Sequence, residues 1–282
     1  MAFLNLAVAP KEFICMLLEK QITAIGYEVV QDADGGLPIL RGSSEIAGKM
    51  AVQIAGRLLE STSDGRGILL GGIPGIPPAD VVVLGGGTIG YYAARSFRGV
   101  GASVYILDND PKRLMELDEL FQGKVVTALA TKSNIEKYVA FADVLIGAVL
   151  VPGQRAPVLV TKEMVQKMAP GSLIIDFAIN QGGCVETSTL APSEDFLFTS
   201  FGVIHFCAPN VPAMVARTSS QWLTNALLPY LREIVHGGVQ QALRQDAALR
   251  RGVYTFGGFL SATLPTTDLL QADLEKLIVG QT

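Results

Sequence analysis

The sequence predicts an α/β protein built on a doubly wound parallel sheet, with a smaller second lobe. Short, continuous apolar runs rich in β-branched residues occur at 81–84, 103–107, 144–149 and 173–178, and helical stretches such as 161–168 lie between them. Unbroken apolar strands that alternate with helices are typical of a parallel sheet covered on both faces. The length of 282 residues exceeds that of most single domains, which favours two lobes.

The composition argues against several classes of protein. The chain has 49% hydrophobic and 17% charged residues and a net charge of −4, and it lacks the basic runs that bind nucleic acid. Its 3 cysteines and 2 histidines, without a Cys-x-x-Cys pair, are too few for a disulfide framework or a zinc site. We therefore expect a protein of the reducing cytoplasm that binds neither nucleic acid nor metal.

One uncharged run, residues 196–216, is long enough to cross a bilayer. It contains His205, Pro209, Asn210 and Pro212, and its polar groups would be costly in lipid. We expect buried strand and loop here. The N-terminus has no basic segment followed by an apolar stretch, so no secretory signal is predicted.

Two long amphipathic helices are expected on either side of the alternating region. In the first, apolar residues recur at helical spacing over 46–59, and Ser44 has a side chain typical of an N-cap. The second extends from Trp222 to Val235 and is expected to end at the glycine pair 237–238. Near the N-terminus, residues 23–30 have the apolar pattern of a buried strand.

A glycine-rich motif follows the first of the central strands. Residues 85–90 read Gly-Gly-Gly-Thr-Ile-Gly, which is the GxGxxG pattern between a strand and a helix. Gly85 allows the tight turn, Gly87 allows a pyrophosphate to approach the backbone, and Gly90 allows the helix to pack closely on the sheet. The N-terminus of that helix offers N–H groups and a partial positive charge to phosphates.

An acidic residue ends the next strand. Asp108 follows Gly85 by 23 residues, close to the roughly 20 expected for the acid that binds the adenosine ribose. Its carboxylate would accept hydrogen bonds from both ribose hydroxyls and repel a 2′-phosphate, which favours NAD over NADP. We assign residues 39–216 to a Rossmann-type NAD(H)-binding domain, and 1–38 with 217–282 to the reduced second lobe.

Six stretches of the sequence carry a resemblance to a known family. They are SEIAGKMAVQ at 44–53, GRGILLGGIPGIPPADVVVLGGGTIG at 65–90, LDNDPKRLMELDELF at 107–121, ADVLIGAVLVPGQRAPVLVT at 142–161, INQGGCVETS at 179–188 and CAPNVPAMVARTSSQWLTNALLPY at 207–230. In these stretches the chain resembles the alanine dehydrogenases and, more distantly, the NAD-binding subunit of proton-translocating transhydrogenases.

The resemblance implies a two-domain subunit, usually in a homo-oligomer, that interconverts a small amino acid with its 2-oxo acid and ammonia. The wide apolar stripe of the helix that begins at Ser44 also suggests a subunit interface. Carried over by position, the dinucleotide contacts are Ser44, Gly85, Gly87, Thr88, Ile89, Gly90, Asp108, Val149, Leu150 and Asn210.

Three departures from the family pattern concern catalysis. Asn5 occupies the position of a family histidine, and Asn180 replaces the catalytic aspartate before the Gln-Gly-Gly motif. The chain also begins where alanine dehydrogenases are already well into the substrate domain, past the arginine and lysine that hold the substrate. Because neither asparagine titrates near neutrality, we expect little alanine dehydrogenase activity from this chain alone.

Two functions remain open at this stage. The first is an NAD-dependent oxidoreductase of the alanine dehydrogenase type that acts on a small amino or imino acid, with Asn180 and Asn5 as altered catalytic residues. The alternative is an NAD-binding subunit or non-catalytic paralogue, which would need a separate chain for the missing lobe or would sense NAD(H). A start at Met1 fits a natural short protein and a fragment equally.

Single residues also have two readings each. Asn180 can orient the substrate or the nicotinamide amide, or it can mark a position freed from constraint. Arg217 can face a phosphate or anchor the connection between lobes. We expect Cys184 to be structural, because neither histidine has an assignable pairing with it, and His205 to be a buried histidine with its hydrogen bonds satisfied.

Overall fold

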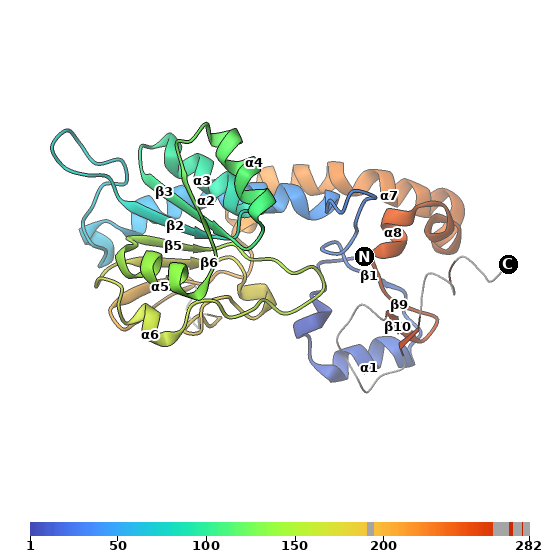
Figure 1. Ribbon diagram of the computed structural model, residues 1–282. Coiled ribbons are helices and arrows are strands. Elements are labelled where there is room, and N and C mark those ends of the chain that lie inside the picture. Colours follow the sequence, from blue (N-terminus) through green and yellow to red (C-terminus); the bar gives the residue numbers. More distant parts are fainter. Residues whose placement is uncertain (191–194, 262–270, 273–277, 279–282) are drawn as a thin grey trace. The chain divides into compact units, whose positions relative to one another are not determined.

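The computed structural model describes residues 1–190, 195–261, 271–272 and 278, and it divides into two compact units (Figure 1). The larger unit contains Ser44–Leu150 and Ala156–Met214, and the smaller one contains Met1–Ser43, Val151–Arg155 and Val215–Thr282. The division suggested by the sequence lies a few residues away, at 39 and 216. Parts of the expected second lobe, 262–270, 273–277 and 279–282, lie outside the described residues.

The larger unit is organised around a seven-stranded sheet in the order β4-β3-β2-β5-β6-β8-β7. Its strands pair in parallel except for β7, which is antiparallel to β8. This arrangement confirms the doubly wound parallel sheet. The strands are β2 (Asp80–Leu84), β3 (Ser103–Asp108), β4 (Val126–Leu129), β5 (Val144–Gly147), β6 (Leu173–Asp176), β7 (Leu197–Ser200) and β8 (Val203–Phe206).

Helices cover both faces of this sheet. Figure 1 shows α3 (Thr88–Gly99) and α4 (Pro111–Phe121) along one face, and α5 (Lys132–Phe141) and α6 (Lys162–Val165) along the other. Because of this coverage, β5 and β6 are buried over their whole length, as are Val81–Leu84 of β2. Such strands must be apolar on both sides, which explains the unbroken apolar runs.

Helix α2 (Pro38–Leu58) contradicts the predicted N-cap and removes the apolar stripe as an argument for a subunit interface. It begins at Pro38, so Ser44 lies inside the helix and is not its N-cap. A proline is well tolerated in the first helical turn, where its missing N–H has no intrahelical acceptor, and the pattern therefore starts earlier than expected. The apolar stripe that suggested an interface is buried, with Ala47, Met50, Ala51, Ile54, Ala55 and Leu58 each at most 8% exposed.

Two other predictions in the larger unit have clear outcomes. The helix expected over 161–168 is a single turn, α6, whose N-cap is Thr161. The uncharged run forms β7, β8 and a loop that includes the 3-10 helix Val211–Val215; β8 is buried as expected, whereas β7 is only partly buried. Among the described residues, no helix is both long and apolar enough to span a bilayer.

The smaller unit combines a four-stranded sheet in the order β1-β9-β10-β11 with three α-helices among its described residues. Leu6, Ile14, Leu17, Tyr254 and Leu260 form part of its core. The strands are β1 (Ala24–Ile25), β9 (Val253–Phe256), β10 (Phe259–Ser261) and β11 (Gln271–Ala272), and the helices are α1 (Lys11–Glu19), α7 (Ala216–Gln245) and α8 (Ala247–Arg251).

Two sequence predictions in this unit need correction. The strand expected over 23–30 is limited to β1, because the chain turns over 27–29. Helix α7 does not end at the glycine pair but bends at Gly238, whose φ of 75° is non-helical, and continues to Gln245. A left-handed glycine commonly ends a helix, but here the following residues resume the helical pattern.

Candidate functional site

The sheet has a topological switch point between β2 and β5. The chain runs outward from β2 through β3 to β4 and then returns to β5 on the other side of β2. In open α/β sheets, ligands bind in the crevice at the carboxyl ends of the strands at such a point. Every predicted cofactor residue of the larger unit except Ser44 lies in a segment that follows or ends one of these strands.

Gly85 and Gly90 make the turn after β2 compact. Gly85 has a φ of +97°, and its N–H donates a 2.8 Å hydrogen bond to the carbonyl of Leu107 in β3. A Cβ atom on Gly90 would lie 1.9 Å from the carbonyl oxygen of Gly85, so helix α3 can approach the turn only without that side chain. Both glycines are required by the local backbone itself.

Gly87 has a different environment. A Cβ atom built on Gly87 meets no heavy atom within 4 Å, and its backbone is in the extended region that any residue can adopt. Gly87 is the N-cap of α3 and gives no side-chain cap, so the N–H groups of Thr88, Ile89 and the next residue begin the helix beside open space. This space and these donors fit an anionic pyrophosphate.

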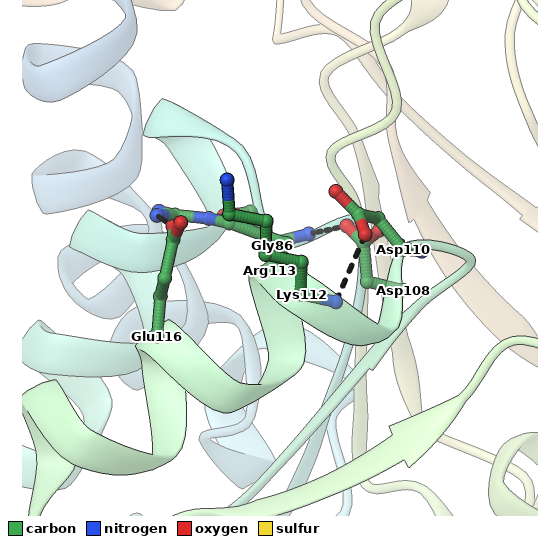
Figure 2. Close-up of polar contacts among 6 residues, drawn as sticks. All are labelled: Gly86, Asp108, Asp110, Lys112, Arg113 and Glu116. Carbon is green, nitrogen blue, oxygen red and sulfur yellow. Dashed lines mark hydrogen bonds and ion pairs between the residues drawn. The ribbon is translucent and has the colours of Figure 1, made fainter.

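The carboxylate of Asp108 lies beside this turn, as Figure 2 shows. One oxygen accepts a 2.6 Å hydrogen bond from the N–H of Gly86, and the other accepts a 2.9 Å bond from the N–H of Asp110. Each carboxylate oxygen can accept a further hydrogen bond, so both remain able to bind hydroxyl groups. The structure therefore couples the acid at the end of β3 directly to the glycine turn after β2.

Arg113 on α4 is a member of this cluster that the sequence reasoning missed. Its Nε–H donates a 2.7 Å hydrogen bond to the carbonyl of Gly86, and its terminal nitrogen pairs with Glu116 at 2.9 Å (Figure 2). The guanidinium is thus fixed beside the same turn as the carboxylate of Asp108. The sequence signal that could have identified Arg113 is its position in the first turns of α4, five residues after Asp108.

On the other side of the switch point, the loops after β5, β6 and β8 carry four further predicted residues: Val149, Leu150, Asn180 and Asn210. Val149 is half-buried and Leu150 is exposed, directly after β5. Asn180 is exposed in the short 3-10 turn Ile179–Gln181 after β6, and its side-chain amide donates a hydrogen bond to the carbonyl of Pro209. Asn180 therefore contacts the loop that carries Asn210.

Asp176, the last residue of β6, is a second group that the sequence reasoning missed. It is 1% exposed, and its carboxylate accepts hydrogen bonds from the N–H groups of Ala178, Cys184 and Val185 at 3.0, 3.0 and 3.2 Å. Burial raises the pKa of this carboxyl above its ordinary value, although the backbone donors oppose that shift.

Cys184 and His205 are both structural, as expected. Cys184 is fully buried, and burial together with the nearby Asp176 raises the pKa of its thiol well above the ordinary value. His205 lies 3.0 Å from the carbonyl of Val203 through Nδ1 and 2.7 Å from the hydroxyl of Thr187 through Nε2. Because a carbonyl only accepts, Nδ1 carries the proton, and burial lowers the pKa of the ring and keeps it neutral.

Asn5, in the smaller unit, is held by a buried carboxylate. Its backbone is left-handed, with a φ of 46°, a conformation in which asparagine and histidine are both enriched. Glu28 is 4% exposed and accepts hydrogen bonds from the N–H groups of Leu4 and Asn5, at 3.2 and 2.6 Å, and from the hydroxyl of Tyr254 at 3.0 Å. Burial, and then the proximity of Glu28, raise the pKa of the Tyr254 phenol above its ordinary value.

Arg217 is exposed in the first turn of α7. Within the described part of the chain, no group of three or more His, Cys, Asp or Glu residues could hold a metal ion. The geometry at the switch point defines an α/β protein with a site suited to a dinucleotide.

Comparison with known proteins identifies the family. Residues 51–262 match the family model described as "Alanine dehydrogenase/PNT, C-terminal domain". Alanine dehydrogenase of Methanococcus maripaludis is 45% identical over 279 residues, which cover 98% of this chain and 74% of that protein. This chain belongs to the alanine dehydrogenase/PNT family.

Solved structures agree with this assignment. A structure titled L-alanine dehydrogenase superposes with a TM-score of 0.83 at 40% identity, covering 98% of this chain and 73% of that one. A transhydrogenase from Sinorhizobium meliloti, at 22% identity, has a TM-score of 0.71 and covers 92% of this chain and 71% of its own, which shows a shared fold.

Proposed function

We propose that this chain binds NAD(H) and is an NAD-dependent oxidoreductase that acts on a small amino or imino acid and its 2-oxo acid. The observation that carries the proposal is the turn at Gly85–Gly90, with open space at Gly87 and the carboxylate of Asp108 beside it. When bound, NAD(H) supplies the hydride acceptor or donor, and the chain's own residues bind and orient the two halves of the dinucleotide.

The altered residues favour substrates that need no proton from the protein. Asn5 and Asn180 donate and accept hydrogen bonds, but neither can act as a general acid or base at neutral pH. An iminium ion that is already protonated needs only a hydride at carbon to become an amine, so its reduction requires no such group. We therefore propose a cyclic or secondary imine as the preferred substrate over free ammonia and a 2-oxo acid.

Substitution of the ribose acid tests the cofactor. We expect the unaltered chain to bind NADH more tightly than NADPH, and Asp108→Ala to weaken NADH binding by about tenfold, on the scale of hydrogen bonds to a charged group. The preference for NADH over NADPH should also become smaller, because Arg113 remains beside the site and no carboxylate is left to repel a 2′-phosphate. Titration calorimetry with both nucleotides measures this, and Asp118→Ala, on the same helix as Arg113, is the control. Equal or tighter binding of NADPH by the unaltered chain would contradict the proposal.

We also propose that the chain forms a homo-oligomer, with an interface that includes the turn Ile73–Ile76. Ile73 and Ile76 pair through two backbone hydrogen bonds of 3.2 and 2.8 Å, and their side chains are 57% and 60% exposed. Nearby Leu69 is 67% exposed. Several large apolar side chains exposed within one short segment favour an interface over a monomer surface.

A charged substitution on this turn tests the assembly. We expect Ile73→Asp to reduce the mass measured by light scattering at micromolar concentration, because the carboxylate would be costly to bury in an apolar interface. Val126→Asp, which changes an exposed valine on the edge strand β4, is the matched control and should keep the mass of the unaltered chain. A monomer mass for the unaltered chain would rule out the proposed oligomer.

A further inference from the structure

We propose that Asp176 is a positioning residue for the nicotinamide half of the dinucleotide. In this role its buried carboxylate fixes the loop 177–185, which carries Asn180, at the carboxyl ends of β5 and β6. The inference rests on the proposed binding of NAD(H) and extends it to a residue that does not itself touch the ligand.

The contacts of Asp176 are concentrated on this loop. One carboxylate oxygen accepts from the N–H of Ala178, just before the 3-10 turn that holds Asn180. The other accepts from the N–H groups of Cys184 and Val185, at the far end of the loop. A single side chain therefore joins both ends of the segment, and the segment's exposed residue, Asn180, lies between them.

Asp176 also lies against the neighbouring strand. It pairs in register with Gly147, the last residue of β5, and a Cβ atom on Gly147 would lie 2.9 Å from the carboxylate and 2.5 Å from the sulfur of Cys184. The backbone after Gly147 continues into Val149 and Leu150. The carboxylate thus sits beneath both loops on the β5–β6 side of the switch point.

The topology assigns the two halves of a dinucleotide to different sides. Asp108 and the glycine turn lie at β2 and β3, so the adenosine half belongs there. The second half of the sheet, β5 and β6, receives the other mononucleotide, which is the nicotinamide half. A defect in the loop after β6 should therefore affect the nicotinamide half and spare the adenosine half.

An amide cannot replace this carboxylate. The hydrogen-bond donors at the Asp176 carboxylate include three backbone N–H groups and the thiol of Cys184, which lies 3.5 Å away. An ionised carboxylate is acceptor-only and suits this set. In Asp176→Asn, the new NH2 group would face a donor, lose one or two of the hydrogen bonds and release one end of the loop.

The test compares two ligands that share the adenosine half. We expect Asp176→Asn to keep the affinity for ADP-ribose within about twofold and to weaken NADH by roughly tenfold, the scale of hydrogen bonds to a charged group. Calorimetry gives both affinities, and enhancement of NADH fluorescence reports the nicotinamide environment directly. A purely structural role would lower both affinities together.

Asp143→Asn is the matched control. Asp143 is another buried carboxylate, which accepts hydrogen bonds from the N–H of Asp80 at 2.8 Å and from Arg66, but it lies just before β5, at the amino ends of the strands. We expect Asp143→Asn to lower the melting temperature and to leave the ratio of NADH to ADP-ribose affinity unchanged.

Gly183→Ala is the second variant if Asp176→Asn does not fold. Its added methyl group would lie 3.1 Å from the Asp176 carboxylate at a φ of +79°, so it displaces the same loop while keeping the charge. An unchanged ratio of affinities in the variant that folds would overturn the inference alone. If the unaltered chain binds neither ligand, the proposed function itself is wrong.

Discussion

We expect Gly87→Val to abolish dinucleotide binding and to leave the fold intact. A Cβ atom at this position meets no protein atom within 4 Å, and the backbone angles at Gly87 suit an ordinary residue. The added methyl groups would instead occupy the space that the pyrophosphate needs in order to reach the first N–H groups of α3. We expect no measurable NADH binding by calorimetry at concentrations where the unaltered chain saturates.

The neighbouring glycines provide the contrast. In Gly90→Ala the new Cβ atom would lie 1.9 Å from the carbonyl of Gly85, so the helix must shift away from the sheet and the melting temperature should fall sharply. Gly87→Val should keep the circular dichroism spectrum and melting temperature of the unaltered chain within a few degrees. Normal NADH binding by Gly87→Val would show that the glycine turn has been wrongly assigned.

The central fold could be predicted because its signals are local. Each buried parallel strand must be apolar on both faces, so 81–84 and 173–176 are recognisable without knowledge of their neighbours. The start of α2 was misplaced because Ser44 is an equally good N-cap and helix-interior residue by pattern alone, and only Pro38 gave the real boundary. The strand after Thr23 was overextended because buried turns and buried strands share an apolar composition.

The candidate site could be predicted only where a motif has fixed spacing. The glycines and Asp108 belong to such a motif. Asp176 and Arg113 instead make contacts with other segments, and these contacts are known only once the chain is folded. In the sequence, Asp176 is only the last residue of a strand. In the structure, the loop 177–185 folds back and donates hydrogen bonds to its carboxylate. The apolar stripe of α2 is covered within the chain, and its spacing alone could not show this, because amphipathic spacing does not say which neighbour covers an apolar face.

Asn180→Asp should raise any deaminating activity of this chain. We expect very little oxidation of L-alanine by the unaltered chain, because Asn5 and Asn180 cannot exchange protons with the substrate near neutral pH. A positioned acid or base typically contributes roughly 10²–10⁴-fold to the rate. A gain of about tenfold is expected from one restored carboxylate, since Asn5 remains unable to titrate.

The contact of Asn180 explains why the gain should be smaller than the full contribution. Its side-chain amide donates a hydrogen bond to the carbonyl of Pro209, and an ionised carboxylate at this position cannot donate one. The new carboxylate would be repelled by that carbonyl and turn toward the crevice, where a proton acceptor is useful. The hydrogen bond that joins the loops after β6 and β8 would then be lost.

The pH dependence separates this explanation from a general effect of charge. Activity gained through Asn180→Asp should rise with pH as the new carboxyl ionises, while the unaltered chain has no titrating side chain at this position. Asn225→Asp adds the same charge at an exposed position of α7 and should leave the rate unchanged.

Steady-state oxidation of L-alanine and reduction of a cyclic imine, each followed by NADH absorbance, measure these rates. Robust alanine turnover by the unaltered chain would refute the role assigned to both asparagines. NADH binding without turnover of any imine or 2-oxo acid, in either form of the chain, would instead favour an NAD-binding subunit or an NAD(H) sensor.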